Sequence, residues 1–177
     1  AEKSKSVIQE SIAKHPTHAK SIFFLTRLIV HLKDRENVKS IGRNLANLST
    51  RRNKTGKEAI RYMSLLHLLQ PLSIGSLKQC INLLEANSYS EPIDFMRIHA
   101  LQYHLSQNQV ERIAVVNECS NHFDLGETKE HLIFCNWLGT LVAHKEIIQF
   151  LSASQAKLDE NLFQLRMNAL AQLNDLE

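Results

Sequence analysis

The sequence predicts an all-α fold, an α-solenoid of about five two-helix repeats, and three observations support this. Only five Gly and three Pro occur in 177 residues, fewer turn-forming residues than a chain of many strands or loops needs. Apolar residues recur at steps of three and four, as at Val38, Ile41, Leu45 and Leu48, which is typical of a helix with one buried face. Short segments also resemble one another at regular intervals along the chain.

Two kinds of helix alternate in the predicted order. Helices that are apolar on most sides, and must therefore be covered on more than one side, are expected near 19–33, 57–70, 91–106, 128–143 and 159–174. Helices with one apolar face are expected near 3–14, 36–49, 73–87, 109–124 and 146–154.

The breaks between these helices contain residues that end or begin helices. They are Pro16, Asp34, the polar run 49–56, the run 90–92 and Gly126. Pro71 and Pro92 are expected in the first turn of a helix, where a missing N–H costs nothing.

The repeat is clearest in segments 60–65, 96–101 and 165–170, each of which has Arg at its second position. The numbers of Arg61 and Arg97 differ by 36, and those of Arg97 and Arg166 by 69, close to one and two units of a helix pair. Such a unit cannot bury its own apolar surface, so its neighbours must stack on it. We therefore expect residues 1–177 to form a single helical-repeat domain. Because the chain begins without Met, we expect it to be a mature chain or an excised fragment, and favour a fragment of a longer chain.

Two stretches resemble a known family. Segment 7–34 places Pro16 after one amphipathic stretch and Phe23-Phe24-Leu25 in the next, and it resembles the junction between two tetratricopeptide repeats. Trp137-Leu138-Gly139 resembles the tryptophan, leucine and small residue of that family's core. The resemblance implies a superhelix whose concave groove, lined by the broadly apolar helices, holds a peptide. Another helical-repeat family stays open as the alternative.

The positions of residues within these helices imply, through the same resemblance, which side chains line the groove. They are Phe23, Arg27, His31, Met63, His67, Arg97, Ala100, Tyr103, His104, Asn136, Thr140 and His144. Packing in the core is the alternative for each, and it is the expected role of Phe23 and Met63.

Four of these, His31, His67, His104 and His144, are expected near the ends of successive broadly apolar helices. One interpretation is a column of imidazoles that contacts an acidic peptide or senses pH. The favoured alternative is that each ring interacts with the negative C-terminal end of its own helix.

Charge is distributed unevenly. Residues 1–90 contain 15 Lys and Arg against 6 Asp and Glu, whereas residues 91–177 contain 6 against 12, giving +9 and −6. The basic residues concentrate in one segment of the first half: Lys33, Arg35, Lys39, Arg43, Arg51, Arg52, Lys54, Lys57 and Arg61.

The basic segment has four interpretations. It could hold an acidic protein tail through charge-assisted contacts. It could be only a solvated face, or it could meet the acidic half of a second copy in head-to-tail self-association. Nucleic acid is disfavoured, because no aromatic residues interleave with the cations as stacking platforms.

No pattern predicts catalysis. The chain lacks a phosphate-binding glycine loop, HExxH and GxSxG, and His15 and His18 have no third metal ligand nearby. Cys80, Cys119 and Cys135 lie among apolar residues and are expected to be buried, reduced thiols. We expect no enzyme activity, no cofactor and no metal. No apolar run approaches the length of a membrane span, and the compartment, cytoplasmic or periplasmic, cannot be distinguished.

The function predicted is therefore a non-catalytic scaffold that binds a protein or peptide through a concave groove and a basic N-terminal half. The alternative is a structural or self-associating regulatory domain of a larger protein.

Overall fold

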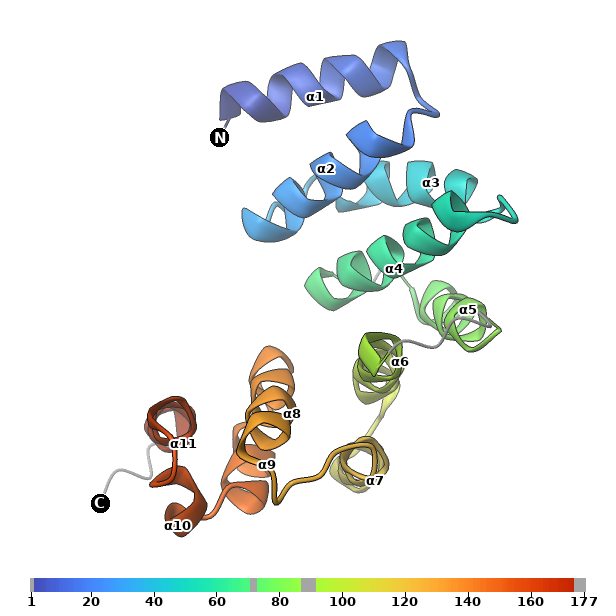
Figure 1. Cartoon of the computed structure of the whole chain (residues 1–177). Helices are drawn as coiled ribbons and strands as arrows, with labels where there is room; N and C mark the ends of the chain where they lie inside the picture. The colour runs from blue at the N-terminus through green and yellow to red at the C-terminus, as the bar shows by residue number, and fades with distance from the viewer. Residues whose placement is uncertain (1, 71–72, 87–91, 174–177) are drawn as a thin grey trace. The chain divides into compact units, whose positions relative to one another are not determined.

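The structure is a computed structural model, and it describes residues 2–70, 73–86 and 92–173. Over these residues the chain forms eleven helices and no strand (Figure 1). The all-α prediction is confirmed, and most contacts join helices that follow one another along the chain.

The helices have the following bounds. They are α1 (Glu2–Lys14), α2 (Ala19–His31), α3 (Val38–Ser49), α4 (Lys54–Leu69), α5 (Ile74–Glu85), α6 (Pro92–Leu105), α7 (Gln109–Ser120), α8 (Thr128–Thr140), α9 (His144–Phe150), α10 (Ala153–Ala156) and α11 (Glu160–Leu173). All ten expected helices are present, and the segment expected as one helix over 146–154 is divided between α9 and α10. Pro92 begins α6 as predicted, whereas Pro71 lies outside the described residues.

The chain divides into two compact units, Ala1–Leu105 and Ser106–Glu177. In the first unit, α4 contacts α2, α3, α5 and α6, and α2 contacts α1, α3 and α4. The broadly apolar helices are therefore covered on several sides, as their composition requires.

One apolar cluster forms the core of the first unit. The predicted stripe of α3 is buried throughout, because Val38, Ile41, Leu45 and Leu48 are each at most 2% exposed. Burying side chains of this size contributes about 1.5–3 kcal/mol each. This stripe therefore anchors α3 and determines which of its residues can face outward.

The second unit contains an aromatic cluster around Phe134. The ring of Phe134 lies 5.5 Å from Phe123, 5.7 Å from Trp137 and 5.2 Å from Phe150, measured between centroids. Trp137 is 5% exposed, so its predicted burial is confirmed. Gln109 of α7 also donates a hydrogen bond of 2.6 Å to the Glu146 carboxylate of α9.

Two predicted boundaries are wrong. Lys54-Thr55-Gly56, expected in a polar loop, form the first turn of α4, because the Asn53 side chain accepts a hydrogen bond of 3.2 Å from the Gly56 N–H and caps the helix there. His144, expected near the C-terminal end of the preceding helix, is instead the first residue of α9.

The backbone conformation after α8 explains why that helix ends before His144. The helix α8 ends at Thr140, Val142 adopts a φ of 58°, and the N–H of Ala143 donates to the Leu138 carbonyl. This pattern ends a helix, although glycine usually occupies the position that Val142 holds. None of the described helices is long and apolar enough to cross a membrane.

Candidate functional site

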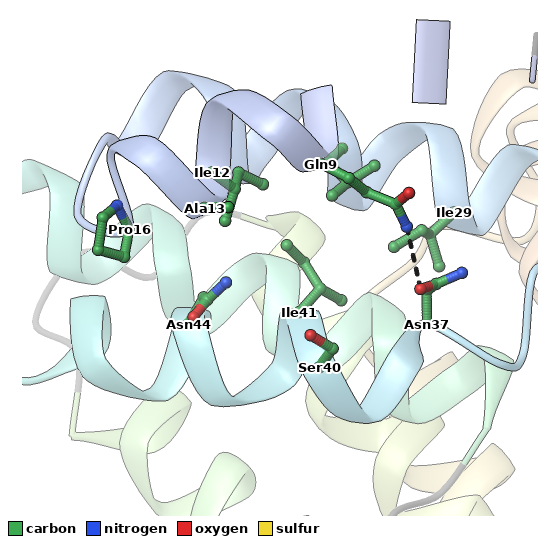
Figure 2. Close-up of a pocket in the computed structure, with 10 residues that line it drawn as sticks. Gln9, Ile12, Ala13, Pro16, Ile29, Asn37, Ser40, Ile41 and Asn44 are labelled. Atoms are coloured by element: carbon green, nitrogen blue, oxygen red, sulfur yellow. Dashed lines mark hydrogen bonds between the residues drawn. The ribbon is translucent and has the colours of Figure 1, made fainter. Parts of the chain in front are cut away.

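The helix α3 lies between two cavities of the first unit. One side of it, together with α1 and α2, lines a cavity of about 400 Å³ (Figure 2). No charged side chain lines this cavity, and Gln9 Nε2 donates to Asn37 Oδ1 across it at 3.1 Å. Its polar groups are amides and a serine, so it has no strong preference for a charged ligand.

The other side of α3 borders a larger cavity of about 490 Å³, which we call the α3–α5 groove. One wall comes from α3 and the turn before it, the floor from α4, and the other wall from α5 and the residue before it. The lining residues are Arg35, Lys39, Gly42, Arg43, Ala46, Met63, Leu66, His67, Gln70, Ser73, Ser76 and Gln79.

Three cations line the α3 wall of this groove. Lys39 and Arg43 are one helical turn apart on α3, and Arg35 precedes the helix. All three are exposed, and none of their side chains has an ion pair or hydrogen bond to another described residue. Because no Asp or Glu lines the groove, the wall presents uncompensated positive charge.

The floor is apolar except for one imidazole. Met63 and Leu66 are 9% and 1% exposed, and His67 is 1% exposed. The Nδ1 atom of His67 is buried and has no hydrogen-bond partner among the described residues. Burial lowers the pKa of His67, so its imidazole is neutral at pH 7.

The α5 wall is polar and uncharged. Ser73 precedes α5 and caps it, since its Oγ accepts a hydrogen bond of 3.1 Å from the Ser76 N–H. The two serine hydroxyl oxygens are 2.9 Å apart, and the amides of Gln70 and Gln79 border the same space. The groove therefore combines three cations, an apolar floor and several neutral hydrogen-bonding groups.

The remaining basic candidates lie outside the groove. Arg51 and Arg52 are exposed in the loop between α3 and α4, where we expected them, and Lys54 is exposed at the start of α4. None of these three forms an ion pair within the described part of the chain. Lys57 is half-buried in the second turn of α4.

Two predicted binding residues, Arg61 and Arg97, contact a buried carboxylate. Asp94 is 3% exposed, and Arg61 donates to its two oxygens at 2.9 and 2.6 Å. Arg97 donates to the same carboxylate at 3.2 Å. The third repeated arginine, Arg166, donates to backbone carbonyls of Ile148 and Leu151 near the end of α9. Arg61 and Arg166 thus join neighbouring helices, whereas the contact of Arg97 with Asp94 lies within α6.

Most of the remaining predicted binding residues of the first unit pack against other side chains. Arg27 donates from Nε to the Tyr62 hydroxyl at 2.5 Å, and Phe23 stacks on the Tyr62 ring at 4.8 Å. Ala100 and Tyr103 are buried.

The four histidines occupy different environments. His31 is exposed at the last residue of α2, and His104 is exposed near the end of α6, its ring 6.2 Å from that of Tyr103. His67 lines the α3–α5 groove. His144 is half-buried at the N-terminal end of α9, whereas we expected it at the C-terminal end of a helix.

In the second unit, Asn136 lines a cavity of about 380 Å³ between α8 and α11. Its amide also donates to the Leu132 carbonyl at 2.9 Å. Thr140 is exposed and donates to the carbonyl of Trp137 in its own helix. Neither placement tests a binding role, which stays a prediction.

The thiols are buried as predicted. Burial raises the pKa of each of Cys80, Cys119 and Cys135 to about 12, so all three are protonated at neutral pH. Across the described residues, no three His, Cys, Asp or Glu side chains gather closely enough to hold a metal ion.

The groove residues that sequence reasoning missed are those of α5 and its approach. Ser76 and Gln79 are three apart on α5 and so lie on one face of that helix, which is the available signal for a polar face. Their position opposite the cations of α3 is a tertiary contact that this spacing does not reveal.

No protein-family model, curated protein or solved structure matches the chain significantly, so no family is identified.

Proposed function

We propose that this chain is a non-catalytic, tetratricopeptide-like α-solenoid that binds an acidic segment of another protein through the basic surface of its first unit. One observation carries the proposal. Six cations between residues 35 and 54 are exposed and have no ion pair within the described chain: Arg35, Lys39, Arg43, Arg51, Arg52 and Lys54.

These cations differ from the arginines that follow them in the sequence. Arg61 and Arg97 are half-buried and engaged by Asp94, so they stabilise the fold. The exposed cations repel one another and contribute no ion pair that would offset the repulsion. Such a surface attracts acidic partners and raises their rate of association.

Two rival partners are less well supported. A single-stranded nucleic acid would use aromatic platforms, and no Phe, Tyr or Trp lines the α3–α5 groove. Self-association is the second candidate, because exposed carboxylates of the second unit, such as Glu118, Glu127 and Glu160, could meet the cations of another copy.

The test compares partners of different charge on the full chain. Fluorescence anisotropy would measure binding of labelled acidic, neutral and basic peptides of about twelve residues, and of a single-stranded oligonucleotide. We expect the acidic peptide to bind most tightly, and we expect its affinity to fall as NaCl rises from ~0.05 to ~0.5 M. Equal binding of all three peptides would contradict the proposal, and so would tighter binding of the oligonucleotide. Sedimentation of the chain alone at low salt measures self-association directly.

A further inference from the structure

We propose that the α3–α5 groove binds an extended acidic segment whose Asp or Glu side chains occupy alternate positions. The inference rests on the proposed function and adds where the partner lies and which sequence pattern it carries.

The spacing of the cations supports this pattern. Residues four apart on a helix are separated by about 6 Å along the axis, which is the case for Lys39 and Arg43. Alternate residues of an extended chain lie about 6.6 Å apart and point to the same side. A segment laid along α3 would therefore place one carboxylate at Lys39 and the next at Arg43. Arg35, at the end of the same wall, is available to a third.

The length of the groove limits the segment. The lining residues from Met63 on α4 to Gln70, which caps the end of that helix, span about 10 Å along the axis. An extended chain advances about 3.3 Å per residue, so the floor accommodates three or four residues, and the turn at Arg35 adds room for one more. A folded helix, about 10 Å across with its side chains, would not enter a space of about 490 Å³ over this length.

The α5 wall and the floor of the groove are suited to an extended segment. An extended segment that joins no sheet needs partners for its N–H and C=O groups. Ser73, Ser76 and Gln79 line the same groove as the cations. The Ser76 hydroxyl already donates to the Ser73 carbonyl, so the amide of Gln79 is the main donor and acceptor on this wall. At the floor, Met63 and Leu66 offer an apolar surface to the side chains between the acidic positions.

The neighbouring cavity provides an internal comparison. It is similar in volume and shares α3 as a wall, but it is lined by no charge. Its Gln9 donates to the side-chain oxygen of Asn37, whose own N–H donates to Asp34. Only the side of α3 that carries Lys39 and Arg43 combines a cavity with cations.

The experiment uses the full chain and two labelled peptides of identical composition. One has three Asp alternating with Ser, and the other has the three Asp in a block. Lys39→Glu with Arg43→Glu reverses the charge of the groove, and Lys3→Glu with Lys20→Glu makes the same change in net charge at exposed positions outside it. Ala46→Leu narrows one end of the groove without altering charge. Circular dichroism checks that each variant is folded.

We expect wild type to bind the alternating peptide about fivefold more tightly than the block peptide, because all three charge-assisted contacts form only with the alternating one. Lys39→Glu with Arg43→Glu should weaken this binding at least tenfold, and Ala46→Leu several-fold. Lys3→Glu with Lys20→Glu should change it less than about twofold at ~0.15 M salt, where the Debye length is about 8 Å.

Two results would overturn the groove assignment while leaving the proposed function intact: equal binding of the two peptides, or equal losses in the two charge-reversal variants. Failure of wild type to bind either acidic peptide would instead overturn the proposed function.

Discussion

At the residue scale, Gly56 occupies a position where no side chain fits. A Cβ atom there would lie 1.9 Å from the carbonyl oxygen of Arg51 and 2.9 Å from its carbonyl carbon. The contact is with backbone, which cannot rotate away as a side chain can. This close approach lets the loop after α3 turn directly into α4.

We expect Gly56→Ala to lower the free energy of unfolding by about 2 kcal/mol, since overpacking of this kind costs about 1–3 kcal/mol. Gly139→Ala is the matched control, because a Cβ at that helical position meets nothing within 4 Å. Ala favours a helix over Gly by up to about 1 kcal/mol, so the control should stabilise slightly. Urea unfolding followed by circular dichroism measures both changes, and a stabilising Gly56→Ala would show that the loop relaxes freely.

The buried imidazole of His67 predicts a pH dependence of stability. Burial lowers its pKa in the folded chain, so protonation favours the unfolded state, where the pKa is near 6.5. The stabilising contribution of the neutral form is present above pH ~6.5 and is lost as pH falls toward the lower folded pKa. We expect wild type to lose more stability than His67→Gln between pH ~7.5 and ~5. Parallel curves for the two proteins would mean that His67 is protonated as easily in the folded chain as in the unfolded one.

At the scale of elements, periodicity predicted the helices well and their ends less well. The stripe of α3 and the apolar composition of α2 and α4 are properties of short segments, so the sequence contains them directly. The ends depend on individual hydrogen bonds. Ser152 and Gln155 form a reciprocal cap that begins α10, and Val142 ends α8 in a conformation rare for a β-branched residue. Neither follows from hydrophobic spacing.

Asp94 links α6 to α4 through Arg61, and its loss should loosen that contact. Asp94→Ala removes the carboxylate that accepts hydrogen bonds from both guanidinium groups, and leaves Arg61 with the Glu58 carboxylate at 3.8 Å. Breaking a buried ion pair in this way costs about 3 kcal/mol or more. The exposed pair of Lys14 and Glu10 is the control, and Glu10→Ala should cost less than about 1 kcal/mol. Chemical unfolding measures both. Equal small losses would show that water replaces the carboxylate of Asp94 readily.

In the second unit, the buried side chain of Trp137 should contribute strongly to stability. Its side chain is 5% exposed and stacks near Phe134, so Trp137→Ala should cost about 3–5 kcal/mol. The indole also provides the measurement, because it is the only Trp in the chain and its fluorescence follows wild-type unfolding. Circular dichroism gives the value for the variant. A loss below about 1 kcal/mol would show that the indole is accessible, and would make Trp137 a candidate binding residue.

At the scale of the whole molecule, the sequence predicted the charge of the candidate site but not its shape. Arg35, Lys39 and Arg43 belong to the basic segment that composition alone identifies. Among the residues that the family resemblance assigned to a concave surface, His67 is a buried polar residue that lines the α3–α5 groove. The α5 wall could not be predicted, because it depends on how α3 and α5 lie on α4. Arg61 and Arg97 were assigned to binding since nothing local reveals that Asp94 engages them.

Cations outside the groove should act on the rate of association rather than on the lifetime of the complex. Arg51 and Arg52 are exposed in the loop after α3 and line no part of the groove, so they attract an acidic partner without holding it. Arg51→Glu with Arg52→Glu should therefore slow association several-fold at ~0.05 M salt, and change the dissociation rate and the stability little. At ~0.5 M salt the Debye length is about 4 Å and the difference from wild type should largely vanish. Stopped-flow fluorescence with the alternating acidic peptide separates the two rates, and Lys39→Glu with Arg43→Glu is the comparison, since loss of direct contacts should speed dissociation. An association rate that matches wild type at low salt would mean that this loop is only a solvated surface.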